Sequence, residues 1–214
     1  MKRNWIPLLF LAGALATPAA VSGPAADGPA PADIVKLKVG STVPKSVTLK
    51  DFEGESLSFG DLRGKVVILH FWSDRCPAER HANPVFMEME ERYAESKDVV
   101  MVGIAANQNE LGAEPEEGAD LSEHYTSLRK KRDKVGYKHT ILADHGNVVS
   151  KLFQARSTPH CFVIDKQGVI QYAGALDDDP RGRKGAEATN YLVDAAAAIL
   201  AGEKLAVTET KPYG

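Results

Sequence analysis

The chain of 214 residues contains only two cysteines, Cys76 and Cys161, and no internal repeat. Two cysteines cannot supply the several bridges of a disulfide-held scaffold, so that class of protein is excluded. The length is sufficient for one domain with a sizeable hydrophobic core. We therefore interpret the two cysteines as groups with a chemical role.

The chain also lacks an excess of positive charge and a long apolar run. Its formal net charge is -3, which gives no overall case for binding nucleic acid. The apolar run at residues 6–16 is too short to span a bilayer comfortably, so no stable membrane span is predicted. Lys2 and Arg3 precede this run and small residues follow it, which is the layout of a secretory signal peptide. No cysteine lies nearby, which argues against a lipoprotein.

The N-terminal region therefore predicts an exported protein, periplasmic or otherwise extracytoplasmic. We assign residues 1–22 to the signal peptide; the alternative is an uncleaved N-terminal anchor. Residues 23–35 are rich in Ala, Pro and Gly and are predicted to be a disordered linker. Residues 36–214 form the predicted globular domain. Export implies an oxidising compartment, where thiols can react or pair.

Hydrophobic periodicity within the globular part predicts a mixed α/β fold. Strands are predicted at 46–49, 56–59, 66–72, 99–106, 140–143, 161–165 and 169–172, and helices at 78–95, 121–134, 147–154 and 186–201. Parallel βαβ units come first and an antiparallel hairpin comes last, so a central mixed sheet flanked by helices is expected. Residues 107–120 are rich in Gly, Glu and Asn and are predicted to be an acidic surface insertion.

The rest of the domain is organised around residues 66–79. Residues 66–72 form a β-branched, near-continuous apolar run typical of a buried strand. Pro77 can open the helix that follows, because a first-turn residue needs no intrahelical N–H bond. Cys76 then lies between a strand end and a helix N-terminus, where free N–H groups and a partial positive charge stabilise a thiolate. The alternative is an inert cysteine.

Charged neighbours of Cys76 act in both directions. Arg75 and Arg80 favour the thiolate, whereas Asp74 and Glu79 oppose it. We expect a net stabilisation of the thiolate. Glu79, one helical turn after Cys76, is interpreted either as a proton acceptor for the thiol or a hydroperoxide, or as a charge that favours the helix N-terminus.

Two segments of the sequence resemble motifs of a known family. Residues 64–77, Gly-Lys-Val-Val-Ile-Leu-His-Phe-Trp-x-x-x-Cys-Pro, are similar to the active-site segment of TlpA-type thioredoxin-like proteins of the AhpC/TSA redoxin superfamily. Ser157-Thr158-Pro159 resembles the cis-proline motif of that family. Residues 173–178 and 209–212 are similar to a peroxiredoxin-like bacterial branch. The resemblance covers about residues 39–214 and implies a thioredoxin-like fold with an N-terminal β extension.

The resemblance departs from the usual Cys-x-x-Cys motif. If Cys76 is the first position, Glu79 occupies the resolving position; if Cys76 is the second, Ser73 occupies the first. Both alignments leave one thiol, so a local dithiol–disulfide cycle is impossible. The peroxiredoxin motif also has a proline at the position of Leu69 and an arginine at the position of Pro159. The site is therefore thioredoxin-like in build, although Ser73 fits the peroxiredoxin pattern.

The resemblance also implies roles for the second loop. Thr158 and a cis Pro159, with Trp72, would shape the surface on which an extended thiol substrate docks; the alternative is a trans proline at a strand start. Cys161, two residues after Pro159, is predicted to lie in the core with His160 on the opposite face. A resolving role for Cys161 is the alternative.

Histidines near these loops raise the question of a metal. A copper chaperone of this fold would use Cys76 with His81 and His160, but the second cysteine of such sites is missing, and we expect both histidines to face solvent. His70 is expected to be a neutral, hydrogen-bonded core residue. No metal and no cofactor are predicted.

The sequence thus predicts a secreted thiol oxidoreductase or antioxidant with one nucleophilic cysteine, Cys76. It would attack a disulfide or a peroxide, and an external thiol would reduce the product. The alternatives are a catalytically inactive thioredoxin-fold binding module, which would use the cis-proline groove and the acidic insertion, and a copper or other metal chaperone.

Overall fold

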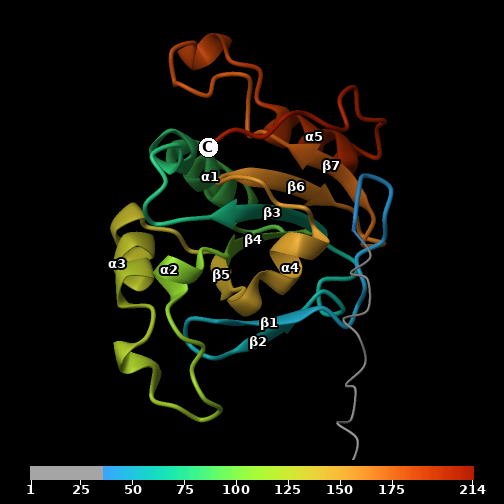
Figure 1. The fold of residues 1–214 in the computed structure, drawn as a ribbon. Helices are drawn as coiled ribbons and strands as arrows, with labels where there is room; N and C mark the ends of the chain where they lie inside the picture. Colours follow the sequence, from blue (N-terminus) through green and yellow to red (C-terminus); the bar gives the residue numbers. More distant parts are fainter. Residues whose placement is uncertain (1–35) are drawn as a thin grey trace, which may run out of the picture. The chain divides into compact units, whose positions relative to one another are not determined.

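The computed structural model describes residues 36–214; the predicted signal peptide and linker lie outside the described residues. The described strands form a seven-stranded sheet in the order β2-β1-β5-β4-β3-β6-β7 (Figure 1). The strands are β1 Thr48–Asp51, β2 Ser56–Ser58, β3 Val66–Trp72, β4 Val99–Ala105, β5 Thr140–Ala143, β6 His160–Ile164 and β7 Ile170–Gly174.

Helices lie against this sheet and in the connections between its strands. They are α1 Glu79–Tyr93, α2 Gln108–Leu111, α3 Thr126–Val135, α4 Val148–Leu152 and α5 Tyr191–Ala201, with short 3-10 helices η1 Leu121–Glu123, η2 His145–Asn147 and η3 Gly185–Glu187. Among the described residues, no helix has the length and apolar character needed to cross a membrane.

The strand directions confirm the predicted mixed sheet. β3, β4 and β5 are parallel neighbours, whereas β6 is antiparallel to both β3 and β7. The β1–β2 hairpin joins the edge of β5 as the predicted N-terminal β extension. The topology places β3 at the centre, with paired neighbours on both sides.

Every residue of β3 is buried, because both faces of the sheet are covered. Val66, Ile68 and Trp72 pack on one face with side chains of α1, α3 and α5. Val67, Leu69 and Phe71 pack on the other face with α4 and the segment that precedes β1. This two-sided burial explains why the strand is a continuous apolar run rather than an alternating one.

Three connections differ from the sequence-based expectation. The predicted insertion at 107–120 contains helix α2, whose start is capped by the Asn107 side chain. Helix α3 begins at Thr126 instead of 121, since the Arg129 guanidinium binds the Leu121 and His124 carbonyls just before it. Helix α5 begins at Tyr191 instead of 186, where the Asn190 side chain caps it.

Candidate functional site

Cys76 lies between the end of β3 and the start of α1, as predicted. β3 ends at Trp72, and α1 begins at Glu79. β3 and β6 are antiparallel with Phe71 opposite His160, so the loop that leaves β3 meets the loop that enters β6. This pairing brings Cys76 beside the Thr158–Pro159 peptide.

The Cys76 thiol contacts that second loop directly. Its half-buried Sγ donates a hydrogen bond to the Thr158 carbonyl oxygen at 2.9 Å. The Thr158–Pro159 peptide bond is cis. Both cysteines are free thiols. The structure thus joins three of the residues that the sequence singled out, namely Cys76, Thr158 and Pro159.

Glu110 of α2 holds the loop before Cys76. The Ser73 hydroxyl donates to Glu110 Oε1 at 2.6 Å, and the Asp74 N–H donates to Oε2 at 3.0 Å. The Asn107 amide also donates to Oε1, at 2.9 Å. The Arg75 N–H donates a hydrogen bond to the Ser73 hydroxyl at 3.3 Å. Ser73 therefore anchors the loop, and its hydroxyl is committed to Glu110.

The carboxyl of Glu79 is enclosed behind this loop. Glu79 is fully buried, and neither of its oxygens has a hydrogen-bond partner of normal geometry among the described residues. Burial raises its pKa, an effect that the nearby Ser73 backbone partly opposes. The negative charge of Glu79 in turn adds to burial in raising the pKa of Cys161. Glu79 is thus an unpaired acid beneath the loop that carries Cys76.

Trp72, predicted to contact substrate, is fully buried at the end of β3. Its indole N–H has no partner among the described residues. The ring packs in the core on the same face as Phe86 and Met89 of α1. Trp72 therefore supports the loop from below and offers no exposed surface in this structure.

Cys161 and His160 point to opposite faces of β6, as expected from strand alternation. Cys161 is fully buried. The expectation that His160 faces solvent is wrong: it is 6% exposed, and its ring packs on Phe162. β6 is an interior strand covered on both faces, so neither side of it reaches solvent. Burial lowers the pKa of His160 to about 4.

His70 and His81, the other two histidines that the sequence singled out, have separate partners. His70 is buried, and its Nε2 lies 3.0 Å from Nε2 of His139; burial and His139 together lower the pKa of His70. It is the neutral core histidine that was expected. His81 Nε2 lies 2.9 Å from Asp177 Oδ2 and is only partly exposed, so it too is not simply solvent-facing. Among residues 36–214, no cluster of three or more His, Cys, Asp or Glu side chains could hold a metal ion.

The segment 208–214 completes the surroundings of the thiol. It runs beside β7, where the Thr210 N–H donates to the Ala173 carbonyl at 3.1 Å. The Tyr213 hydroxyl donates to Asp177 Oδ1 at 2.5 Å. Gly214 then lies against Thr158, where an added Cβ would collide with the Thr158 carbonyl. Figure 1 shows this end of the chain near the start of α1.

Sequence reasoning missed two parts of this arrangement, Glu110 and the terminal segment. Glu110 lies 37 positions after Ser73 and 36 positions after Asp74, the two loop residues that it binds. It belongs to a stretch that was predicted to be acidic surface. The Asn107 cap is the one local signal that a helix begins there. For Tyr213 and Gly214 the sequence carries no comparable signal, since their contacts depend on where α5 ends.

Comparisons with known proteins show which family and which fold the chain resembles. The family model described as AhpC/TSA family matches residues 39–173. Peroxiredoxin Q, chloroplastic, of Triticum aestivum is 31% identical over 145 residues, covering 64% of this chain and 58% of the relative. Thiol-disulfide oxidoreductase ResA of Halalkalibacterium halodurans is 32% identical over 122 residues, covering 57% and 60%. The chain spans less than two thirds of the length of either relative.

Solved structures show the same fold. A hypothetical protein from Sinorhizobium meliloti 1021 superimposes with a TM-score of 0.67 at 23% identity, covering 84% of this chain and 93% of that one. A protein from Chlorobium tepidum assigned as a thiol:disulfide interchange protein DsbE gives a TM-score of 0.51 at 22% identity, covering 64% and 85%. The fold is thioredoxin-like, and because the family model matches more than half of the chain, the protein belongs to the AhpC/TSA family.

Proposed function

We propose that the protein is a thiol–disulfide oxidoreductase that works through one nucleophilic thiol, Cys76. The observation that carries this proposal is the hydrogen bond from Cys76 Sγ to the Thr158 carbonyl, next to the cis Pro159. It sets a half-buried thiol beside the Thr158 backbone, with which an extended substrate can pair. Cys161, fully buried, has no such access.

The reaction balances with one protein thiol. The Cys76 thiolate attacks one sulfur of a substrate disulfide, the S–S bond breaks, and the departing sulfur leaves as a thiolate that takes up a proton. The product is a mixed disulfide on Cys76. An external thiol then attacks that bond, releases Cys76 and is itself oxidised. Ser73 occupies the place of a neighbouring thiol, so this external reductant is required.

Glu79 is the proposed proton acceptor for this chemistry. Burial raises its pKa, so the Glu79 carboxylate is a stronger base than an exposed carboxylate. Ser73 has a positioning role, because its hydroxyl and the Asp74 N–H tie the loop to Glu110. Trp72 fixes the strand end beneath them. Export through residues 1–22, into an oxidising compartment, is part of the same proposal.

The test is to identify which sulfur reacts. The full chain is incubated with oxidised glutathione, and the adduct is located by mass spectrometry of the intact and digested protein. We expect one glutathione on Cys76, none on Cys161, and complete release by an added monothiol. Cys76→Ser should abolish the adduct, whereas the matched variant Cys161→Ala should keep it.

Hydrogen peroxide provides the comparison for peroxidase chemistry. A sulfenic acid on Cys76 formed faster than the glutathione adduct, at equal reagent concentrations, would overturn the preference for disulfides and support the antioxidant alternative. Absence of any adduct on Cys76 with either reagent would overturn the redox proposal altogether and leave a binding module.

A further inference from the structure

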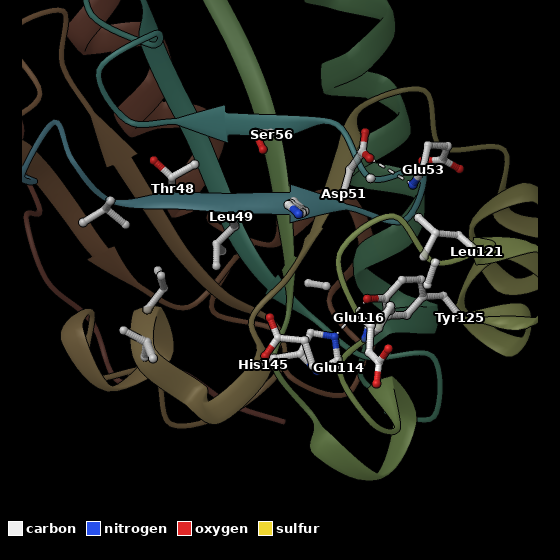
Figure 2. A pocket seen from close by; sticks show the side chains of 18 of the residues that line it. Thr48, Leu49, Asp51, Glu53, Ser56, Glu114, Glu116, Leu121, Tyr125 and His145 are labelled. Carbon is white, nitrogen blue, oxygen red and sulfur yellow. Dashed lines mark hydrogen bonds between the residues drawn. The ribbon is translucent and has the colours of Figure 1, made fainter.

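A cavity of about 840 Å³ lies between strand β1 and the segment 114–125. Figure 2 shows Leu49 of β1 facing His145, Glu114 and Tyr125 across it. Neither Cys76 nor Thr158 lines this cavity, so it is separate from the candidate redox site. Its volume lies in the range of sites that enclose a ligand.

One wall of the cavity is an incompletely paired strand edge. β5 pairs with β1 only at Lys50 and Asp51, because β5 ends at Ala143 and the chain then turns into η2. Thr48 is therefore paired with β2 alone. An open edge of this kind is a template on which another strand can form.

The backbone groups at that edge point toward the cavity side. The Asp51 N–H donates to the Glu55 carbonyl, and the Val47 carbonyl accepts from Phe59, so alternate residues of β1 face β2. In an antiparallel ladder the residues between them direct their N–H and C=O groups to the other side. Thr48 thus presents one donor and one acceptor where β5 would continue.

Apolar side chains form another part of the lining. The cavity is lined by Leu49 of β1, by Val47 just before that strand, and by Val149 and Leu152 of α4. Val148 beside them is 58% exposed, which is unusual for a large apolar side chain in this molecule. An extended segment laid along β1 would therefore find apolar contacts for every second side chain.

The charge around the cavity is mainly negative. Asp51 and Glu53 are engaged, the former by the Glu53 and Glu55 N–H groups and the latter by Arg132. Glu114 and Glu116 are exposed, and neither has an ion-pair partner within residues 36–214. The lining includes one lysine, Lys50, and no arginine. The free charge at the mouth thus favours a cationic occupant.

We propose that this cavity binds an extended basic segment of a partner polypeptide, which adds as a strand to the open edge of β1. Its backbone pairs with Thr48, alternate apolar side chains pack on Leu49 and Leu152, and a lysine or arginine lies near Glu114 and Glu116. Strand addition supplies affinity through main-chain hydrogen bonds, and the side-chain contacts supply selectivity.

The test uses the full chain and a labelled peptide that alternates lysine and valine. Fluorescence anisotropy should report saturable binding, and hydrogen exchange should show slowed exchange of the Thr48 amide in the complex. The analogue that alternates glutamate and valine should bind at least about tenfold more weakly. Equal binding of the two peptides, or no binding of the basic one, would overturn the proposal.

Three variants separate strand addition from other modes of binding. Thr48→Pro removes the N–H that faces the cavity together with the side-chain hydroxyl that donates to Ser46, at an edge position that tolerates proline, and should weaken binding about tenfold. Thr48→Ala keeps the N–H and should bind as the unchanged chain does. The double variant Glu114→Gln, Glu116→Gln should weaken binding and reduce its salt dependence. Circular dichroism checks that each variant is folded.

Cys76→Ser controls for binding at the redox site. It should leave the affinity for the basic peptide unchanged, whatever the outcome for the redox proposal. Loss of peptide binding in Cys76→Ser would place the peptide at the candidate redox site beside Thr158 and contradict the assignment to β1. Unchanged peptide binding by folded Thr48→Pro would also contradict the assignment to β1.

Discussion

At the scale of single residues, the candidate site depends on buried polar groups whose partners are far away in sequence. Cys76 meets Thr158, and Ser73 meets Glu110. The sequence predicted the first pair through a family resemblance, because both members lie in recognisable motifs. It did not predict the second, because a glutamate in a Gly- and Glu-rich stretch carries no sign that it will be buried.

The burial of Glu79 leads to a pH-dependent stability. Its pKa is raised in the folded chain, so the folded state holds the proton more tightly than the unfolded state does. Stability contributed by this group is therefore present below the unfolded pKa of about 4.3 and is lost as the pH rises toward the folded pKa. Glu79→Gln cannot ionise and should not lose stability in this way.

We expect the difference in the free energy of unfolding, Glu79→Gln minus the unchanged chain, to increase as the pH rises above about 4.3. The increase should be up to about 1.4 kcal/mol per pH unit. Urea titrations at a series of pH values measure this difference. Glu88→Gln, on the exposed side of the same helix, is the matched control and should show no such trend. Parallel pH profiles for Glu79→Gln and the unchanged chain would show that the carboxyl is not protonated by burial.

At the scale of elements, the site is the meeting place of three connections. These are the β3–α1 loop with Cys76, the loop before β6 with Thr158, and the segment 208–214 that reaches Thr158. Glu110 of α2 adds a fourth support. Local patterns predicted the flanking strands well, whereas the starts of α3 and α5 were misplaced, because side-chain caps and an arginine from the next turn set those boundaries.

The segment 208–214 should limit access to the Thr158 backbone beside Cys76. Gly214 rests on the Thr158 backbone, where an extended substrate would also pair, and the Tyr213–Asp177 hydrogen bond holds it there. Tyr213→Phe removes one hydrogen bond, which is worth about 1 kcal/mol, or about fivefold in the population of the displaced segment. The rate of glutathione adduct formation at Cys76 should rise by a similar factor.

Two controls accompany this measurement. Tyr191→Phe, in α5, leaves the segment 208–214 in place and should not change the rate. A small alkylating reagent, which does not need to pair with Thr158, should respond less to Tyr213→Phe than oxidised glutathione does. An unchanged rate with oxidised glutathione would mean that the segment does not compete with substrate.

At the scale of the whole molecule, the order of elements along the chain predicted a mixed sheet flanked by helices, and the family resemblance predicted that this sheet is thioredoxin-like. Alternating strand and helix patterns up to β5, followed by the β6–β7 hairpin, allow few arrangements other than a mixed sheet with β3 inside it. The cavity beside β1 was not predictable. It exists because β5 ends opposite Lys50, two residues short of the Thr48 end of β1. No residue pattern marks a shortfall of that kind.

The proposed function requires that this fold makes Cys76 more reactive than a thiol in an unfolded chain. The most direct measurement is the rate at which Cys76 forms a mixed disulfide with oxidised glutathione in the folded chain and in the same chain unfolded in urea. Both are measured at one pH in the Cys161→Ala background. We predict a folded rate at least about twofold higher, from the helix N-terminus beside the thiol. A folded rate equal to or below the unfolded rate would contradict a redox role for Cys76.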